Sequence, residues 1–176
     1  LAEQEGRIDE ALELYRRAVE QDPLSAGGYE RLGVAYLSAG RPAESEAALR
    51  KAVALAPQRI NAHAHLALAL VVQRRLDEAR DEAERESDRL YRLLALTVMN
   101  HAQGRPSDSD ESLRTLIEEG AAGGAFQIAE AYAARNEFDA SFGWLGRAHA
   151  QRDPGLAEIK GSALLSMGLI TYCEAR

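Results

Sequence analysis

Cysteine, aromatic residues and long apolar runs are all scarce in this chain of 176 residues. The single Cys173 cannot form an internal disulfide, so nothing requires an oxidising compartment. The longest apolar run near the C-terminus, residues 163–173, is too short to cross a bilayer and contains Ser and Gly. No secretory leader is visible at the start. These features predict a cytoplasmic protein without a membrane span.

Basic residues are outnumbered by acidic ones. The 21 Lys and Arg face 28 Asp and Glu, which gives a net charge of −7. Nucleic-acid binding is favoured by a basic stripe, so we expect no nucleic-acid partner. Aromatic residues make up 6% of the chain, and Ala, Arg and Glu are abundant. This composition favours stacked helices over a β-sandwich.

A pattern of spaced residues returns about every 34 positions, and such a period indicates a repeat architecture. The clearest copy lies at residues 26–59, where the pattern consists of Leu32, Gly33, Tyr36, Gly40, Ser45, Leu49, Ala52 and Pro57. Small residues such as Gly33 and Ala52 allow close helix packing. Proline stops a helix because it lacks the N–H group and restricts the residue before it.

The pattern resembles the tetratricopeptide repeat over roughly residues 6–154. This resemblance implies an all-α fold, an α-solenoid of stacked antiparallel helix hairpins in a right-handed superhelix. The expected array is a half repeat at 1–24 followed by repeats at 25–58, 59–88, 89–120 and 121–154. Residues 155–176 are expected to form a C-terminal capping helix or tail. The last repeat is also similar to C-terminal tetratricopeptide regions of bacterial multidomain signalling proteins.

Glycine and proline predict where the hairpins turn. Turns are expected at Gly6-Arg7, at Gly40-Arg41-Pro42 and at Gly104-Arg105-Pro106, and a further turn is expected at Arg74-Arg75. Residues 77–89 depart from the pattern, because Glu86 stands where Ala52 stands in the clearest copy. Acidic and basic residues alternate there, which predicts a solvated helix face; an acidic docking face or weak cation site is the alternative.

The sequence offers little chemistry. His63 and His65 are the candidate metal ligands. They are two residues apart on a predicted helix, so their side chains point to different faces. His63 takes the position of Tyr29 and is expected to pack. Cys173 has no evident activating partner, and the glycines at 120–124 lack the Lys and Ser or Thr of a phosphate loop. We therefore predict no catalytic, cofactor or metal site.

The resemblance also implies a groove lined by the first helix of each repeat. The periodicity assigns to this groove Glu30, Val34, Leu37, Asn61, Ala64, Leu68, Val71, Tyr91, Leu94, Val98, His101, Phe126 and Glu130. A mostly apolar lining of this kind suits an amphipathic helix or an extended peptide. The alternative is that residues 164–170, or repeats upstream, cover the groove.

Some members of the family hold a peptide carboxylate with Lys, Asn and Arg. The matching positions here are Glu30, Val34, His65, Tyr91 and Ala95. None carries the required side chain, so capture of a C-terminal carboxylate is not expected.

Three functions follow as hypotheses. The first is a non-catalytic scaffold that binds a protein or peptide partner, with a homodimer through the two uncapped ends also possible. The second is a regulatory or sensor region of a larger signalling protein, such as a cyclase, kinase or transcription regulator. The third, an enzyme on an α-solenoid, has no supporting constellation of residues.

Overall fold

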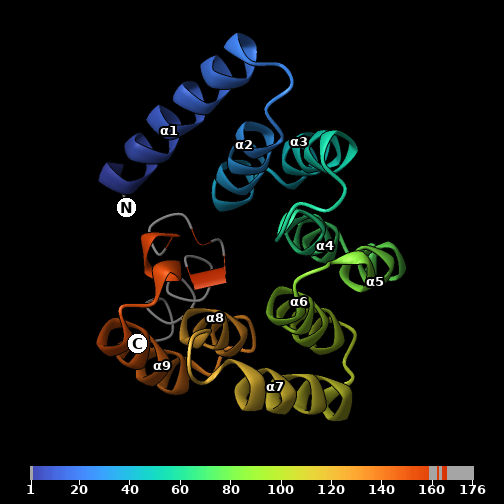
Figure 1. Ribbon diagram of the computed structural model, residues 1–176, viewed down its shortest axis with the longest axis vertical. Helices are drawn as coiled ribbons and strands as arrows, with labels where there is room; N and C mark the ends of the chain where they lie inside the picture. The colour runs from blue at the N-terminus through green and yellow to red at the C-terminus, as the bar shows by residue number, and fades with distance from the viewer. Residues whose placement is uncertain (1, 159–161, 163, 166–176) are drawn as a thin grey trace. The chain divides into compact units, whose positions relative to one another are not determined.

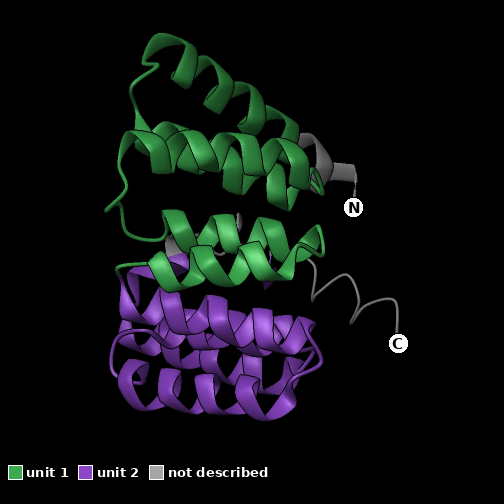
Figure 2. Cartoon of the chain, turned by 90° about the vertical axis from the view of Figure 1, so that its right-hand side faces the viewer, with its two compact units in different colours: residues 1–87 green, residues 88–176 purple. Residues whose placement is uncertain are grey.

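The computed structural model describes residues 2–158, 162, 164 and 165. These residues form α-helices and one short 3₁₀-helix, and strands are absent from this part of the chain. The chain divides into two compact units, residues 1–87 and 88–176 (Figure 2). The all-α prediction is confirmed, and each unit is a stack of helical hairpins.

The first unit contains two hairpins and a preceding helix (Figure 1). Its helices are α1 (Ala2–Gln21), α2 (Ala26–Ser38), α3 (Pro42–Leu55), α4 (Ala62–Val72) and α5 (Leu76–Arg85). Helices α2 and α3 pair, as do α4 and α5, while α1 packs on α2 and α3 packs on α4. The two first helices, α2 and α4, also touch each other.

The second unit repeats this arrangement. Its helices are α6 (Arg89–Ala102), α7 (Pro106–Gly120), α8 (Ala125–Ala134) and α9 (Phe138–Gln151), followed by the 3₁₀-helix η1 (Pro154–Glu158). Helices α6 and α7 form one hairpin and α8 and α9 the next. Helix α8 contacts both helices of the preceding hairpin, and η1 packs on α8 and α9.

The turns at Gly40, Arg74 and Gly104 form where the sequence predicted them. Gly40 and Gly104 have φ of 69°, and Arg74 takes the same left-handed conformation with φ of 62°. Glycine adopts this conformation without a Cβ clash. Pro42 and Pro106 follow at the first helical positions of α3 and α7, where the missing N–H is not needed.

The predicted turn at Gly6-Arg7 is wrong. Helix α1 runs without interruption from Ala2 to Gln21 and passes through both residues. The residues before Gly6 are Ala, Glu and Gln, which favour helix, and one glycine inside a helix costs only about 1 kcal/mol relative to alanine. Local helix preference therefore outweighs the turn signal.

The two helices of a hairpin meet at small residues. A Cβ atom on Gly33 of α2 would lie 2.5 Å from Cγ of Leu49 on α3. Serine hydrogen bonds join the helices of the two hairpins in the second unit. Ser109 Oγ donates to the Thr97 carbonyl at 3.0 Å, and Ser141 Oγ donates to the Ala129 carbonyl at 2.8 Å. Each bond joins the second helix of a hairpin to its first helix.

The solvated-helix prediction for residues 77–89 is wrong at two glutamates. Glu82 is 7% exposed and Glu86 is 1% exposed. Glu82 Oε2 lies 2.7 Å from Nδ1 of His63, and Glu86 Oε2 accepts the backbone N–H of Ala64 at 3.1 Å. A buried carboxylate needs such partners, because an unpaired buried charge is strongly unfavourable.

Glu86 thus caps a helix to which it does not belong. The first turn of α4 lacks a side-chain cap of its own, and Glu86 takes this role from the end of α5. The second unit has the same device, since Asp153 Oδ2 accepts the N–H of Phe126 in the first turn of α8 at 3.0 Å. In these two hairpins, a carboxylate after the second helix therefore satisfies the start of the first helix of the same hairpin.

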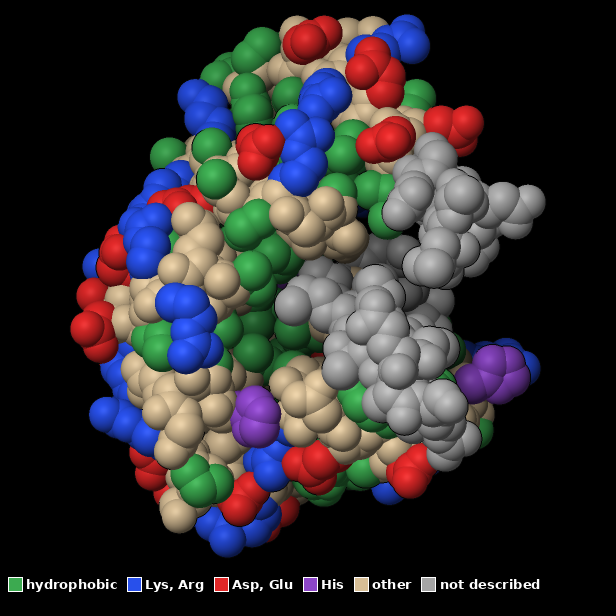
Figure 3. Space-filling model, turned by 180° about the vertical axis from the view of Figure 1, so that it is seen from behind, with side chains coloured by type: hydrophobic (Ala, Val, Ile, Leu, Met, Phe, Trp, Pro, Cys, Tyr) green, Lys and Arg blue, Asp and Glu red, His purple; other side chains and the backbone are tan. Residues whose placement is uncertain are grey.

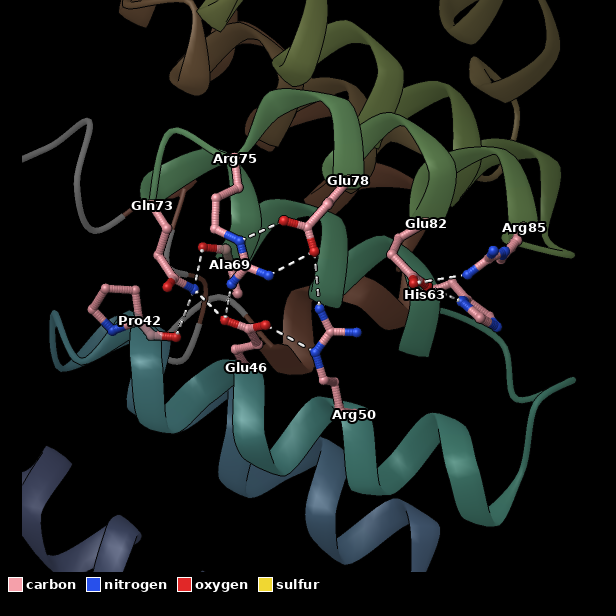
Figure 4. A network of polar contacts seen from close by, with 10 residues as sticks. All are labelled: Pro42, Glu46, Arg50, His63, Ala69, Gln73, Arg75, Glu78, Glu82 and Arg85. Atoms are coloured by element: carbon pink, nitrogen blue, oxygen red, sulfur yellow. Dashed lines mark hydrogen bonds and ion pairs between the residues drawn. The ribbon is translucent and has the colours of Figure 1, made fainter.

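A polar network joins the two hairpins of the first unit (Figure 4). Glu46 of α3 accepts from Nε2 of Gln73 at 2.9 Å and from Nη1 of Arg75 at 2.6 Å. Arg50 donates to the other oxygen of Glu46 at 2.8 Å. Gln73 and Arg75 belong to the turn between α4 and α5, so the network fixes α3 against the following hairpin.

The close contact at Gly33 gives a stability prediction. Gly33→Ala should lower the free energy of unfolding by about 1–3 kcal/mol, because the added methyl group overpacks against Leu49. Gly143→Ala is the matched control: it lies within α9 and its Cβ would meet nothing within 4 Å. The control should gain up to about 1 kcal/mol from helix propensity. Urea unfolding followed by circular dichroism measures both, and a stabilised Gly33→Ala protein would contradict the packing account.

Candidate protein-interaction site

The predicted groove residues lie on first helices that touch each other within each unit. In the first unit they come from α2, from α4 and from the residue before α4; in the second they come from α6 and α8. The sequence spacing therefore placed them on neighbouring elements. Two local faces result, which we call the α2/α4 face and the α6/α8 face.

Much of each face is buried. Leu37, Ala64, Leu68, Val71, Leu94, Val98 and Phe126 are each at most 9% exposed. Val34, Asn61, Tyr91 and Glu130 are half-buried, and His101 is exposed. The accessible part of the predicted site is therefore confined to these five positions, and the other residues pack the helices that carry them.

A buried carboxylate forms the polar centre of the α2/α4 face. Glu30 is 6% exposed, and Nε of Arg59 donates to its Oε2. Nδ1 of His65 lies 3.4 Å from the other oxygen. Burial opposes the charge on Glu30, but the contacts with His65 and Arg59 outweigh burial and lower the pKa of its carboxyl. Glu30 is thus held ionised between α2, α4 and the connection before α4.

This carboxylate gives a prediction about pH. A pKa lowered in the folded state stabilises the fold above the unfolded pKa of about 4.3, and the stabilisation is lost as the pH falls through the folded pKa. Glu30→Gln should therefore destabilise the protein at neutral pH, by on the order of 1–3 kcal/mol. The difference from wild type should shrink as the pH is lowered below about 4. Thermal unfolding across pH measures it.

Glu84→Gln is the control for this experiment, because Glu84 is exposed on α5. Its unfolding should follow that of the wild type at each pH. A Glu30→Gln protein whose deficit stays constant from neutral to acid pH would show that the charge on Glu30 is not what stabilises the face.

Residues from the C-terminal segment contact α8 on the α6/α8 face. Ser162 Oγ donates to Oε1 of Glu130 at 2.6 Å, and Leu165 joins a buried cluster with Phe126. Leu164 and Leu165 are 9% and 4% exposed. Of the residues 164–170 that could cover the groove, Leu165 therefore contacts it and Leu164 is buried, while residues 166–170 lie outside the described residues. No pattern in the sequence pointed to Ser162.

The other sequence candidates have structural roles. His63 packs against Glu82, as its position in the repeat predicted, although the glutamate partner was not foreseen. Trp144, which is not one of these candidates, packs beside a buried cluster, with the Arg147 guanidinium 4.1 Å from the centre of its ring. Among the described residues, no group of three or more His, Cys, Asp or Glu could hold a metal ion. Cys173 lies outside them.

Charge on the surface is mixed in sign. Basic and acidic side chains alternate over the face drawn in Figure 3, with apolar side chains between them. Arg89 pairs with Glu119 at 2.6 Å, and Arg135 pairs with Asp110 and Glu137, each at 2.6 Å. No described helix is both long and apolar enough to cross a membrane.

Comparison with known proteins agrees with this architecture. Residues 1–60 match the family model described as tetratricopeptide repeat. Residues 1–60 therefore carry tetratricopeptide-repeat sequence. Such repeats are generally protein–protein interaction modules without catalytic activity, and this match supports an interaction scaffold of the helical-repeat kind. A search of curated proteins gives no match.

Solved structures show the same fold as this chain. A crystal structure of MamA aligns with a TM-score of 0.57 at 20% identity and covers 84% of this chain and 90% of its own. A second MamA structure gives 0.56 at 19% identity, covering 86% of each chain. YrrB, described as a tetratricopeptide protein with an unusual peptide-binding site, gives 0.53 at 20% identity, covering 94% of this chain and 87% of its own.

Proposed function

We propose that this chain is a non-catalytic scaffold that binds a peptide or an amphipathic helix on the exposed sides of its first helices. The proposal names the α2/α4 face and the α6/α8 face as the sites. It assigns the accessible contacts to Val34, Asn61, Tyr91, His101 and Glu130, which are half-buried or exposed.

The contact between α8 and residues near the C-terminus is the observation that supports this proposal best. Ser162 and Leu165 lie on α8 and bring one polar and one apolar contact, at Glu130 and in the cluster around Phe126. Residues outside the helical hairpins thus bind to α8, which is the first helix of its hairpin. This combination of apolar anchor and fixed polar group is typical of peptide recognition by helical grooves.

The rigidity of the α2/α4 face is a second reason for the proposal. Glu30 joins α2 to α4 and to Arg59, and Glu86 caps the start of α4. A face whose backbone and polar groups are fixed before binding loses less conformational entropy when a partner docks. Val34, one turn after Glu30 on α2, remains half-buried beside this fixed centre.

The test uses peptides selected from a displayed random library on the wild-type chain. Val34→Glu adds a charge to the α2/α4 face, and His101→Glu does so on the α6/α8 face. At least one change should weaken binding of the selected peptides tenfold or more, because a desolvated charge opposes an apolar anchor. Fluorescence anisotropy measures the dissociation constants, and circular dichroism checks that helix content is retained.

Leu24→Glu is the matched control, since Leu24 is 77% exposed in the connection between α1 and α2, outside both faces. It should bind the selected peptides as the wild type does. Peptides that bind all three variants equally well would show that neither first-helix face is the site. Selective loss with Leu24→Glu would place the site on the connecting loops instead.

A further inference from the structure

The hydrogen bond between Ser162 and Glu130 has a defined donor and acceptor. Glu130 is a carboxylate that accepts hydrogen bonds, and Ser162 Oγ donates to it at 2.6 Å. Hydroxyl-to-carboxylate bonds of this length are among the stronger neutral-to-charged hydrogen bonds. Ser162 Oγ also accepts the backbone N–H of Leu165 at 3.2 Å, which begins a helical turn at residues 164 and 165. One serine therefore binds α8 and fixes the leucine that follows.

The apolar contact lies on the same side of α8. Phe126, Glu130 and Ala133 are spaced by four and three residues, so they share one side of the helix. Leu165 belongs to the buried cluster that contains Phe126, Ala133 and Ala148 of α9, and Trp144 and Leu145 pack against it. The serine and the leucine thus meet a carboxylate and an apolar surface that stand side by side.

We propose that this surface of α8 and α9 is a peptide site whose resident ligand is the part of the chain that carries Ser162 and Leu165. An external partner would carry the same chemistry, a hydroxyl side chain three residues before a leucine, and would compete with the resident segment. The inference rests on the proposed function and adds to it the ligand chemistry and an internal competitor.

The contact between Ser162 and Glu130 indicates which peptides would not bind. An acidic or phosphorylated side chain at the serine position would face Glu130 and be repelled. A side chain without a donor would leave the half-buried carboxylate without its hydroxyl partner. The tethered segment has the advantage of a high effective concentration, so a partner must bind more tightly or be abundant to displace it.

The test uses the full chain and a fluorescent synthetic peptide with the sequence of residues 159–168. The peptide should bind the wild type weakly, because the resident segment occupies the site. A full-length Ser162→Asp/Leu165→Asp double variant, in which that segment is repelled, should bind the peptide at least tenfold more tightly. Adding Glu130→Ala to the double variant should abolish the gain. A peptide with aspartate in place of the serine should not bind either protein.

Several outcomes would overturn the inference. Equal affinity of the peptide for wild type and double variant would show that the segment does not occupy the site. Failure of the double variant to bind the peptide, with library-selected peptides still sensitive to Val34→Glu or His101→Glu, would overturn this inference and leave the proposed function standing. Insensitivity of those peptides to both changes would overturn the proposed function.

The milder Ser162→Ala variant decides the matter if the double variant does not fold. It removes only the hydroxyl that contacts Glu130 and Leu165. It should bind the added peptide several-fold more tightly than the wild type while unfolding cooperatively. Unchanged peptide affinity in this variant, together with a lowered melting temperature, would show that the segment only caps the last hairpin.

Discussion

Close packing between the two helices of a hairpin is the constraint on which the rest of the structure depends. At Gly33 the backbone of α2 lies so near Leu49 of α3 that no side chain fits between them. A single hairpin cannot bury its apolar surface alone. Ser45 and Ala52 of α3 are fully buried, and α3 packs on α4 of the next hairpin. First helices then meet one another within each unit, which creates the faces proposed for binding.

Buried carboxylates complete this packing where the repeat pattern departs from small residues. Glu86 occupies a position that is alanine in the clearest copy, yet it is accommodated because the start of α4 needs an acceptor for its N–H groups. Asp153 serves α8 in the same way and also accepts the N–H of Gly155 at 2.8 Å. These acids are part of the core, whereas Glu30 and Glu130 lie on the proposed binding faces.

The sequence predicted the hairpins because their signals are local. Gly40 with Pro42, and Gly104 with Pro106, mark a left-handed residue followed by a helix start, and both turns form as expected. The period also placed the groove residues on first helices. The local signal failed at Gly6, where neighbouring helix-forming residues continue α1 through the predicted turn.

The repeat pattern did not predict contacts between residues that are far apart in the sequence. Glu86 pairs with a backbone group 22 residues away and Ser162 with a side chain 32 residues away, and neither pairing has a periodic signature. The burial of Leu68 and Val98 was missed for a related reason, because spacing identifies the side of a helix but not what covers it. The accessible positions of the two faces therefore emerged only from the structure.

Hydrogen exchange measured by mass spectrometry, with and without a library-selected peptide, tests the central claim most directly. If the first helices form the binding faces, the peptide should slow exchange in α2 and α4, or in α6 and α8, and leave the second helices α3, α5 and α7 unchanged. Slower exchange confined to the second helices would contradict the account, since the partner would then dock on the opposite side of the hairpins.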